Sequence, residues 1–254
     1  PANGSTICIG GTVNATFNTS SNGTGTCTNN YRSSIDGGVT WLAYTPPANL
    51  TAVTAGANRI QIQSNRTCDG SGCDGTGETF ATVVQWTVVA DPTVTTQPVA
   101  ATICSGGTRV LTAAITAGTG LTYQWEQSTD NITFVNEVGG TGGTTLSYTT
   151  AALTANLYHR LRVNSGVGCT PNPLYSTAVL TTVVADPTLT APASNTVCVG
   201  ASQAISTVAA GGTSTFTYQW QYSSNGTSGW ANVVNATPTG ITYTTPTAAT
   251  MTIV

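Results

Sequence analysis

Val88-Val89-Ala90-Asp91-Pro92-Thr93 returns about 95 residues later as Val183-Val184-Ala185-Asp186-Pro187-Thr188. The stretch Thr6-Ile7-Cys8-Ile9-Gly10-Gly11-Thr12 returns as Thr102-Ile103-Cys104-Ser105-Gly106-Gly107-Thr108, and more loosely between Thr196 and Ser202. Tyr123-Gln124-Trp125 likewise recurs as Tyr218-Gln219-Trp220. A unit copied in tandem builds length or valency, and this is rarely how a single active site is made. The sequence therefore predicts a string of domains.

The composition is that of a secreted, low-charge material. There are six basic residues, all of them arginine, and nine acidic residues, which gives a net charge of −3. So few cations cannot displace the counterions of a nucleic acid. The sequence has no run of about 18 apolar residues, the length that a membrane-spanning helix needs. It also does not begin with a charged and then apolar leader segment. We therefore expect a secreted, extracellular or cell-surface protein with no nucleic-acid partner and no membrane insertion.

The local patterning is β throughout. Apolar and polar residues alternate in Arg109–Thr116, Leu121–Gln127 and Tyr158–Val163, as half-buried strands require. Residues Tyr175–Val184 form one long β-branched run without proline. Glycine-rich turns such as Gly139-Gly140 separate the runs, and no stretch has a helical period. Short strands in units of this length predict Greek-key sandwiches.

The order of these motifs is similar to that of a known family. Each unit reads Cys-x-Gly-Gly/Ala-Ser/Thr, then Tyr-Gln-Trp, a turn, an aromatic residue, a Tyr-Thr-Thr strand and Tyr-x-Arg-x-x-Val, and it closes with Gly-Cys-Thr and a Thr/Val strand. This pattern resembles the immunoglobulin-like repeats of large surface proteins secreted by Bacteroidota, including gliding-type adhesins. The first unit departs from it, with Tyr31 in place of the core tryptophan and extra cysteines at Cys27 and Cys73. The resemblance implies an extracellular structural or adhesive role, and it carries over no catalytic residues.

We accordingly predict an all-β protein of tandem immunoglobulin-like Greek-key β-sandwiches in an extended row. The domains are expected at residues 1–91, 92–186 and 187–254, which we call repeats 1, 2 and 3. The proline in each short linker should stiffen the joint. Repeat 3 stops after Ile241–Thr245 and its turn, so it is expected to lack strands F and G. Without these strands the core and one sheet edge of repeat 3 would be exposed. We therefore expect either that the polypeptide continues past Val254 or that a neighbouring subunit donates strands.

Aromatic residues have two interpretations. Tyr31, Trp125 and Trp220 are predicted to be core aromatics of the sandwiches, and the alternative is a platform for a sugar. Trp41, Phe134 and Trp230 follow after a tight turn, where they either cover the sheet edge or contact a ligand. The single histidine, His159, is expected to be solvated or half-buried. No paired carboxylates, phosphate loop or CxxC motif is present, so we predict neither an enzyme nor a cofactor.

Two further motifs invite a binding interpretation. Between Cys68 and Glu78, oxygen ligands at Asp69, Ser71, Asp74 and Glu78 could bind calcium; the alternative, which leaves the protein without a metal, is a polar loop pinned by cysteine. Nine Asn-x-Ser/Thr triplets are candidate glycosylation sites, although many arise by chance in such a composition: Asn3, Asn14, Asn18, Asn22, Asn49, Asn65, Asn131, Asn225 and Asn235.

The seven cysteines of a secreted-looking chain should be oxidised. Pairing within one domain would join Cys104 to Cys169 and Cys8 to Cys68. A strand of about seven residues at roughly 3.3 Å each separates Cys104 from Cys169, whereas a disulfide needs Cα atoms within roughly 7 Å. In a head-to-tail row we therefore favour Cys8 with Cys169, across two domains. Cys27 should pair with Cys68 or Cys73, and Cys104 with a cysteine that repeat 3 lacks; Cys198 is the seventh candidate.

Two functions remain in competition. The first is a structural stalk or filament on a bacterial surface, whose partners are copies of itself or further repeats of the same chain. The second is an adhesin whose first domain or loops bind a surface glycan or another surface ligand. Short repeated linkers favour the first function, and the distinctive first domain favours the second.

Overall fold

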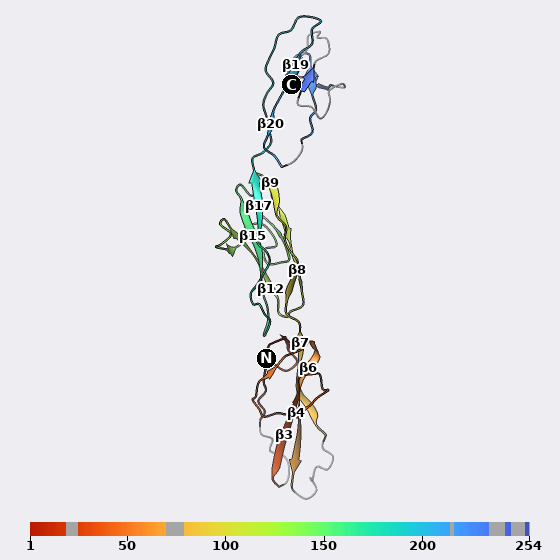
Figure 1. Cartoon of the computed structure of the whole chain (residues 1–254), viewed down its shortest axis with the longest axis vertical. Helices are drawn as coiled ribbons and strands as arrows, with labels where there is room; N and C mark the ends of the chain where they lie inside the picture. Colours follow the sequence, from red (N-terminus) through yellow and green to blue (C-terminus); the bar gives the residue numbers. More distant parts are fainter. Residues whose placement is uncertain (19–24, 70–78, 214–215, 234–241, 245–251, 254) are drawn as a thin grey trace. The chain divides into compact units, whose positions relative to one another are not determined.

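The computed structural model of the chain contains strands and no helix in the residues that it describes, which are 1–18, 25–69, 79–213, 216–233, 242–244 and 252–253 (Figure 1). The chain divides into two compact units. The first comprises Pro1–Val99, Arg109–Ala151 and Leu157–Leu180, and the second comprises Ala100–Thr108, Ala152–Asn156 and Thr181–Val254.

Repeat 1 is built from two antiparallel layers with one parallel edge. The larger sheet has the strand order β1-β7-β6-β3-β4, and β2 pairs with β5. β1 runs parallel to β7, while β3 and β6 pair antiparallel over their whole common length, from Cys27 opposite Cys68 to Ser34 opposite Gln61. The strands are β1 Thr6–Cys8, β2 Thr12–Val13, β3 Cys27–Ser34, β4 Leu42–Ala43, β5 Leu50–Thr51, β6 Gly56–Cys68 and β7 Ala81–Val89.

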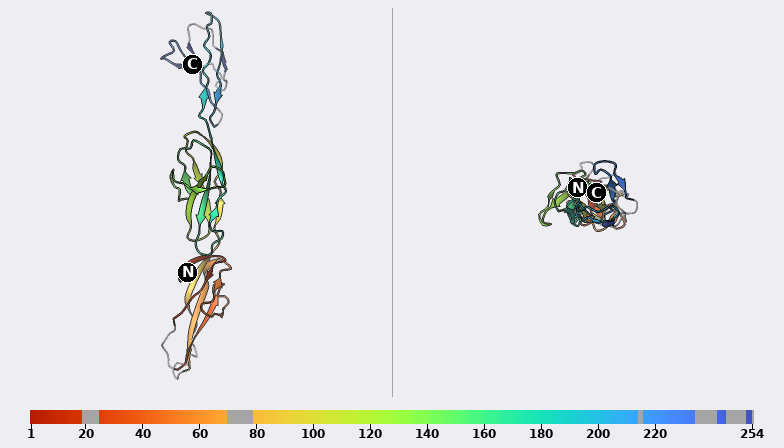
Figure 2. Two further views of the ribbon diagram at one scale, coloured as in Figure 1. Left: turned by 90° about the vertical axis from the view of Figure 1, so that its left-hand side faces the viewer. Right: turned by 90° about the horizontal axis from the view of Figure 1, so that it is seen from above.

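Repeat 2 has the same plan, and its strands lie side by side along the repeat (Figure 2). The main sheet has the order β13-β12-β15-β17-β9, with β16 paired to β15; β10 pairs with β14, and β11 with β8. The strands are β8 Thr93–Thr96, β9 Ala101–Cys104, β10 Val110–Thr112, β11 Ala114–Thr116, β12 Thr122–Ser128, β13 Val135–Asn136, β14 Ser147–Thr149, β15 Leu157–Asn164, β16 Leu174–Tyr175 and β17 Val179–Val184.

In repeat 3 the described strands form three small sheets, β18-β20, β19-β23 and β22-β21-β24. β24 pairs with β21 so that Thr252 lies opposite Ser223. In repeat 2, Tyr158 of β15 lies opposite Ser128 in the same way, so β24 stands where strand F begins. The strands are β18 Thr188–Leu189, β19 Ala204–Ser206, β20 Ala209–Ala210, β21 Gln221–Ser223, β22 Ala231–Asn232, β23 Thr242–Thr244 and β24 Thr252–Ile253.

The cores follow the period of two that the sequence shows. Along β15 the side chains of His159, Leu161 and Val163 are fully buried, while those between them are partly exposed. The core of repeat 2 also contains Leu111, Ala113, Trp125, Tyr148 and Val179, and that of repeat 1 contains Ile7, Val13, Tyr44, Ala52, Ile60, Ile62, Trp86 and Val88. Repeats 1 and 2 therefore bury the inward row of their strands.

Two predicted features differ from the structure. The single strand expected over Tyr175–Val184 is divided into β16 and β17. The division falls at Ser176, whose hydroxyl oxygen accepts the backbone N–H of Leu161 at 2.8 Å and so takes the place of a ladder carbonyl. His159, expected to be solvated or half-buried, is 0% exposed. It faces inward because it shares its side of the strand with Leu161.

Candidate functional site: the junction of the first two repeats

A glycine turn at the end of β1 forms one side of the junction. The amide N–H of Gly11 donates to the carbonyl oxygen of Cys8 at 3.1 Å, and Gly10 has a φ of 84°, which favours glycine. Gly10 N–H donates to Ala52 O at 2.7 Å, and Ala52 N–H donates back to Gly11 O at 2.9 Å. With Cys8 held opposite Val89 on β7, the turn is fixed on both sides. We call Cys8–Gly11 the cysteine turn of repeat 1.

The other side of the junction is the loop between β15 and β16 of repeat 2. Cys169 of this loop forms a disulfide with Cys8, with a Cα–Cα distance of 4.7 Å. The amide N–H of Cys8 also donates to the carbonyl oxygen of Val167 at 3.0 Å. Cys8 is 0% exposed and Cys169 is 4% exposed, so solvent does not reach the bond freely. The structure thus joins the pair of cysteines that the head-to-tail arrangement predicts.

Two glycines allow the turn and the loop to meet. A Cβ added to Gly168, whose φ is +80°, would lie 2.4 Å from the Cα of Gly11. A Cβ added to Gly11 would lie 3.1 Å from the Cα of Gly168. Since both neighbours are backbone atoms, neither position has room for a side chain. The Gly-Cys and Gly-Gly motifs are therefore explained by one close approach.

The linker takes part in the same junction. The carboxylate of Asp91 accepts the backbone N–H of Thr170 at 2.8 Å, and its second oxygen lies 3.5 Å from the Thr170 hydroxyl. The carbonyl oxygen of Ala90 accepts the N–H of Gly118 at 2.9 Å. The linker is hence bonded to two loops of repeat 2 in addition to the disulfide. This gives the repeated Ala-Asp dipeptide a physical role.

The other cysteines divide into two groups. Cys27 and Cys68 form a cross-strand disulfide between β3 and β6, with a Cα–Cα distance of 4.0 Å. Among the described residues, Cys104 and Cys198 are free thiols. Cys73 lies outside the described residues. The structure does not join Cys104 to Cys169 or Cys8 to Cys68, which the pairing within one domain would require.

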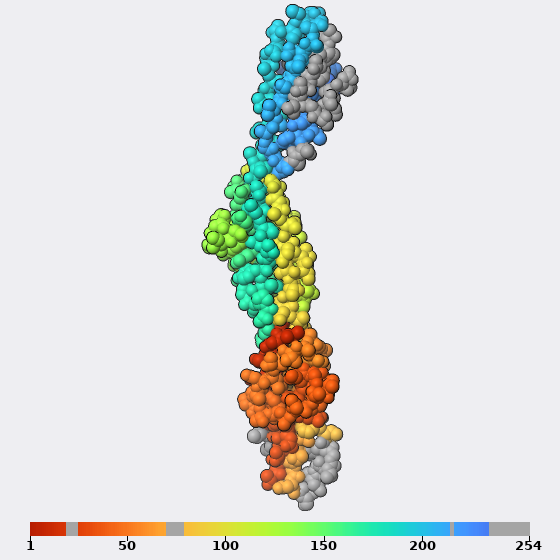
Figure 3. All heavy atoms as spheres, in the orientation of Figure 1, coloured from red at the N-terminus to blue at the C-terminus, as the bar shows by residue number. Residues whose placement is uncertain are grey.

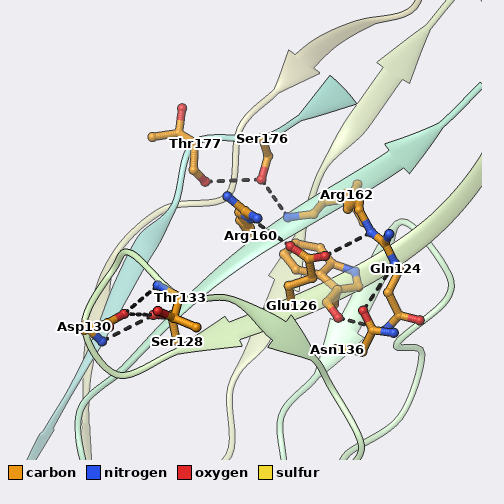
Figure 4. A network of polar contacts seen from close by, with 12 residues as sticks. Gln124, Glu126, Ser128, Asp130, Thr133, Asn136, Arg160, Arg162, Ser176 and Thr177 are labelled. Atoms are coloured by element: carbon orange, nitrogen blue, oxygen red, sulfur yellow. Dashed lines mark hydrogen bonds and ion pairs between the residues drawn. The ribbon is translucent and has the colours of Figure 1, made fainter. Parts of the chain in front are cut away.

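In repeat 2, the buried carboxylate of Glu126 pairs with two partly exposed arginines (Figure 4). Its carboxylate lies 2.8 Å from Nε of Arg160 and 2.9 Å from Nε of Arg162. The guanidinium of Arg160 is also sandwiched between the rings of Phe134, at 3.9 Å, and Tyr175, at 4.1 Å. Cation–π contacts of this kind add to the ion pair.

Repeat 1 contains the same sandwich with the arginine on the opposite strand. Arg32 of β3 lies 4.7 Å from the centroid of the Trp41 ring and 4.2 Å from that of Phe80, and its guanidinium donates to Gln63 of β6. Arg32 is the neighbour of Tyr31 as Glu126 is the neighbour of Trp125. An arginine therefore covers one ring face of Trp41 and of Phe134, two of the three positions considered for a ligand; the third is Trp230.

The three predicted core aromatics differ in burial. Trp125 is 0% exposed and Trp220 is 5% exposed. Tyr31 is only half-buried, packs against the core of repeat 1 and stacks on Phe17 with ring centroids 4.7 Å apart. The fully buried tryptophan of repeat 1 is Trp86 on β7, which the sequence comparison of the repeats does not single out.

Buried polar groups surround His159. Its Nε2 lies 3.0 Å from Oε1 of Glu137, and its ring lies 6.1 Å from that of Tyr148. Burial raises the pKa of the Tyr148 phenol above its ordinary value, and the neighbouring Glu137 raises it further. The cluster lies within the core of repeat 2, so we assign it a structural role.

The calcium and glycosylation candidates are distributed as follows. Asp69 accepts the N–H of Thr26 at 2.5 Å, whereas Ser71, Asp74 and Glu78 lie outside the described residues. Within the described ranges, no group of three His, Cys, Asp or Glu side chains could hold a metal ion. Among the triplets, Asn22 and Asn235 are not described and Asn65 is half-buried; the exposed ones are Asn3, Asn14, Asn18, Asn49, Asn131 and Asn225.

The turns that follow β3, β12 and β21 have a similar polar geometry in the three repeats. Asp36 and Asp130 accept backbone N–H groups from the following residues, and Asn225 does so in repeat 3. The pKa of Asp130 is lowered from 3.8 to about 2, first by the N–H of Ile132. The pKa of Asp36 is also lowered, first by the hydroxyl of Ser34. The turns of Asp36 and Asp130 therefore favour the ionised carboxylate.

A pH dependence follows from these two turns. A carboxylate with a lowered pKa stabilises the fold above its ordinary pKa and loses that contribution as pH falls through the folded pKa. We expect the urea midpoint to fall between about pH 4 and pH 2. Asp130→Asn should reduce this fall, because the amide of Asn225 makes the same turn without ionising. Urea titrations at pH 5 and pH 2.5 measure the difference, and an unchanged pH response in the variant would contradict the assignment.

The ion network supports a second prediction. Glu126→Ala leaves Arg160 and Arg162 without their carboxylate and should lower the unfolding free energy by about 1–3 kcal/mol. Asn136→Ala is the matched control, because Asn136 accepts only one exposed hydrogen bond, at 3.2 Å from Arg162. That change should cost no more than about 0.5 kcal/mol. Equal losses in the two variants, measured by denaturant unfolding, would show that the Glu126 carboxylate contributes no more than one exposed hydrogen bond.

The segment between β12 and β14, coloured lime green, projects from the side of repeat 2 (Figure 3). It carries Ile132 and Val138, which are 83% and 93% exposed.

No helix in the described part of the chain is both long and apolar enough to cross a membrane.

Comparisons with known proteins place this fold. The family described as "Domain of unknown function (DUF8696)" matches residues 93–185. No curated protein matches the chain. The three N-terminal domains of the highly immunogenic outer capsid protein of bacteriophage RB49 align with a TM-score of 0.54 and 14% identity, covering 96% of this chain and 84% of that one. The fold is that of tandem immunoglobulin-like domains.

Two other solved structures are similar at lower scores. A fragment of three immunoglobulin domains of titin has a TM-score of 0.46 and 12% identity, covering 87% of this chain and 76% of that one. Domains 1–4 of Sidekick-1 have a TM-score of 0.36 and 13% identity, covering 88% of this chain and 60% of that one.

Three features of the structure do not emerge from the sequence analysis: the carboxylate of Asp91, the close approach at Gly168 and the arginine sandwiches. The first could have been found, because Asp91 recurs as Asp186 in a chain with so few charged residues. The arginine of the sandwich lies on β3 in repeat 1 but on β15 in repeat 2, so no single aligned position of the repeats reveals it.

Proposed function

We propose that the chain is part of an extracellular structural protein that forms a stalk or filament on a bacterial surface. The observation that carries this proposal is the disulfide between Cys8 and Cys169, which ties repeat 1 to repeat 2. A bond between domains contributes little to the core of either one, but it limits bending at the linker. The hydrogen bond from Thr170 to Asp91 acts in the same direction.

Two disulfides also support an extracellular location, because such bonds persist in oxidising compartments. The low charge and the absence of lysine suit a protein that resists proteases cutting at basic residues. The adhesin is the alternative. The arginine that covers one ring face of Trp41 removes part of the surface on which a sugar would stack.

Single-molecule stretching tests the stalk directly. With the disulfide intact, the 161-residue separation between Cys8 and Cys169 cannot extend when the chain is pulled by its ends. Reduction should therefore add roughly 560 Å of contour length, at about 3.5 Å per residue. Cys8→Ser/Cys169→Ser should show this length without reductant. If the oxidised wild-type chain already extends fully, the mechanical role is excluded.

A further inference from the structure

The turn after β21 contains an asparagine followed by a glycine. Asn225 is exposed to solvent, and Gly226 has a φ of 72°. The side-chain amide of an asparagine can react with the backbone nitrogen of the residue that follows it. Glycine hinders this approach least, because it has no Cβ. Hydrolysis of the ring that forms leaves aspartate or isoaspartate, so the pair is a candidate modification site.

The hydrogen bonds of Asn225 prepare its amide for this reaction. The side-chain oxygen Oδ1 accepts the backbone N–H groups of Thr227 at 3.0 Å and of Ser228 at 2.9 Å. An attack on Cγ places negative charge on Oδ1, and two fixed donors stabilise that charge. The nitrogen Nδ2, which has to leave, donates to the hydroxyl oxygen of Ser228 at 3.0 Å. Each atom of the amide group that changes in the reaction therefore has a defined partner.

The attacking nitrogen is also oriented. The N–H of Gly226 donates to the hydroxyl oxygen of Ser223 at 3.1 Å, so the proton that this nitrogen has to lose already points at an acceptor. Ser223 is 0% exposed, and its hydroxyl oxygen lies 3.0 Å from Oδ1 of Asn225. One buried hydroxyl therefore contacts both of the groups that have to combine.

The other two repeats show that the turn accommodates the product. Asp36 and Asp130 occupy the position of Asn225, each two residues after a buried serine whose hydroxyl donates to the carboxylate, at 2.6 Å and 2.7 Å. Figure 4 shows this turn in repeat 2, where Ser128 and Thr133 contact Asp130. Hydrogen bonds to a carboxylate are stronger than those to a neutral amide oxygen. An aspartate at position 225 therefore gives repeat 3 a turn that repeats 1 and 2 already contain.

The Asn3–Gly4 pair of repeat 1 has the same sequence in a different setting. The N–H of Gly4 donates to the carbonyl oxygen of Gln85 on β7 at 2.8 Å, and the N–H of Gln85 donates to Oδ1 of Asn3 at 2.9 Å. Ring closure at Gly4 has to break this pairing with a strand, whereas ring closure at Gly226 gives up one hydrogen bond to a side chain. Asn3 is therefore an internal reference for Asn225.

From these contacts we infer that Asn225–Gly226 is a self-modification site, at which the folded turn converts the asparagine to aspartate. The change adds one negative charge to repeat 3 after synthesis and gives its turn the carboxylate of the other two repeats. This site goes beyond the proposed function, because it does not involve the bond between Cys8 and Cys169.

The covalent change consists of a cyclisation and a hydrolysis. The backbone nitrogen of Gly226 bonds to Cγ of Asn225, the bond from Cγ to Nδ2 breaks, and Nδ2 leaves as ammonia with the proton that Gly226 loses. One water molecule then opens the ring: its hydroxyl group goes to Cγ and its remaining proton returns to the Gly226 nitrogen. The sum is asparagine plus water giving aspartate plus ammonia, and no oxidant or reductant takes part. Opening at the other ring carbonyl gives isoaspartate.

The test follows the full chain, free of N-glycans, at neutral pH in buffer and in urea at the same temperature. Mass spectrometry of the chymotryptic peptides that contain Asn3 and Asn225 measures how fast each is converted. In urea the two pairs should react at similar rates. In the folded chain we expect Asn225 to react at least about tenfold faster than Asn3, because the backbone pairing of Asn3 slows its reaction. Asn225 should also react faster in the folded chain than in urea.

The variant Asn225→Asp checks whether the turn favours the product. It should raise the thermal unfolding midpoint of repeat 3 at neutral pH, because the N–H groups of Thr227 and Ser228 then bond to a carboxylate. Asn195→Asp is the matched control, since it adds the same charge at an exposed position of the same repeat. Its midpoint should stay at the wild-type value.

Three kinetic results would overturn the proposal: protection of Asn225 to the level of Asn3 in the folded chain, a folded rate no higher than the rate in urea, or isoaspartate as the sole product. A midpoint of Asn225→Asp no higher than that of Asn195→Asp would overturn it as well. None of these results affects the proposed function, which rests on Cys8 and Cys169.

Discussion

Gly168→Ala should break the junction between repeats 1 and 2. The new Cβ would lie 2.4 Å from the Cα of Gly11, and no side-chain rotation relieves this contact, because the position of a Cβ is fixed by its own backbone. A positive φ adds about 1–2 kcal/mol for a residue other than glycine. Because the loop has to move away from the turn, we expect Cys8 and Cys169 to remain unbonded in a large fraction of the molecules.

Thiol titration under denaturing conditions measures this effect, with a rise toward two additional thiols per chain. Gly4→Ala is the matched control, because Gly4 has a φ of +78° and nothing within 4 Å of its added Cβ. It carries the conformational cost without the clash, so its thiol content should stay at the wild-type level. An oxidised Gly168→Ala chain would show that the close approach is unnecessary.

The second large effect is expected from Cys8→Ser/Cys169→Ser. By chain entropy alone, a bond that closes a loop of 161 residues stabilises the folded chain by about 5 kcal/mol. Loss of the bond should lower the unfolding free energy by up to that amount and should let repeats 1 and 2 unfold independently. Calorimetry should then resolve their transitions, which the bond couples in the wild-type chain.

The comparison variant is Cys27→Ser/Cys68→Ser, which removes the bond with a separation of 41 residues inside repeat 1. Its estimated loss is similar, about 4 kcal/mol, but it should fall on the transition of repeat 1 alone. If both variants gave the same pattern of transitions, the Cys8–Cys169 bond would not couple the repeats.

The sequence predicts the strands well where side chains alternate, and β12 and β15 lie within a few residues of the expected runs. It predicts the cysteine pair of the junction because strand length alone keeps Cys104 away from Cys169. It misses the break between β16 and β17, since that depends on one serine hydroxyl replacing a ladder carbonyl.

The remaining features depend on cross-strand register. Glu126 meets Arg160 because β12 and β15 pair directly at these residues, and neither position is unusual on its own. The burial of His159 follows from its sharing a face with Leu161, which only the assembled sheet reveals. The role of Asp91 requires the F–G loop to fold back on the linker, about 79 residues away in sequence.

The most direct test of the account is non-reducing peptide mapping of the oxidised chain. Trypsin with chymotrypsin separates the relevant cysteines, because cleavage at Phe17 lies between Cys8 and Cys27, and cleavage at Phe80 lies between Cys68 and Cys104. Free thiols are alkylated first, so that exchange during digestion is blocked. The account predicts one linked pair that contains Cys8 and Cys169. A linked pair that contains Cys104 and Cys169 would contradict it.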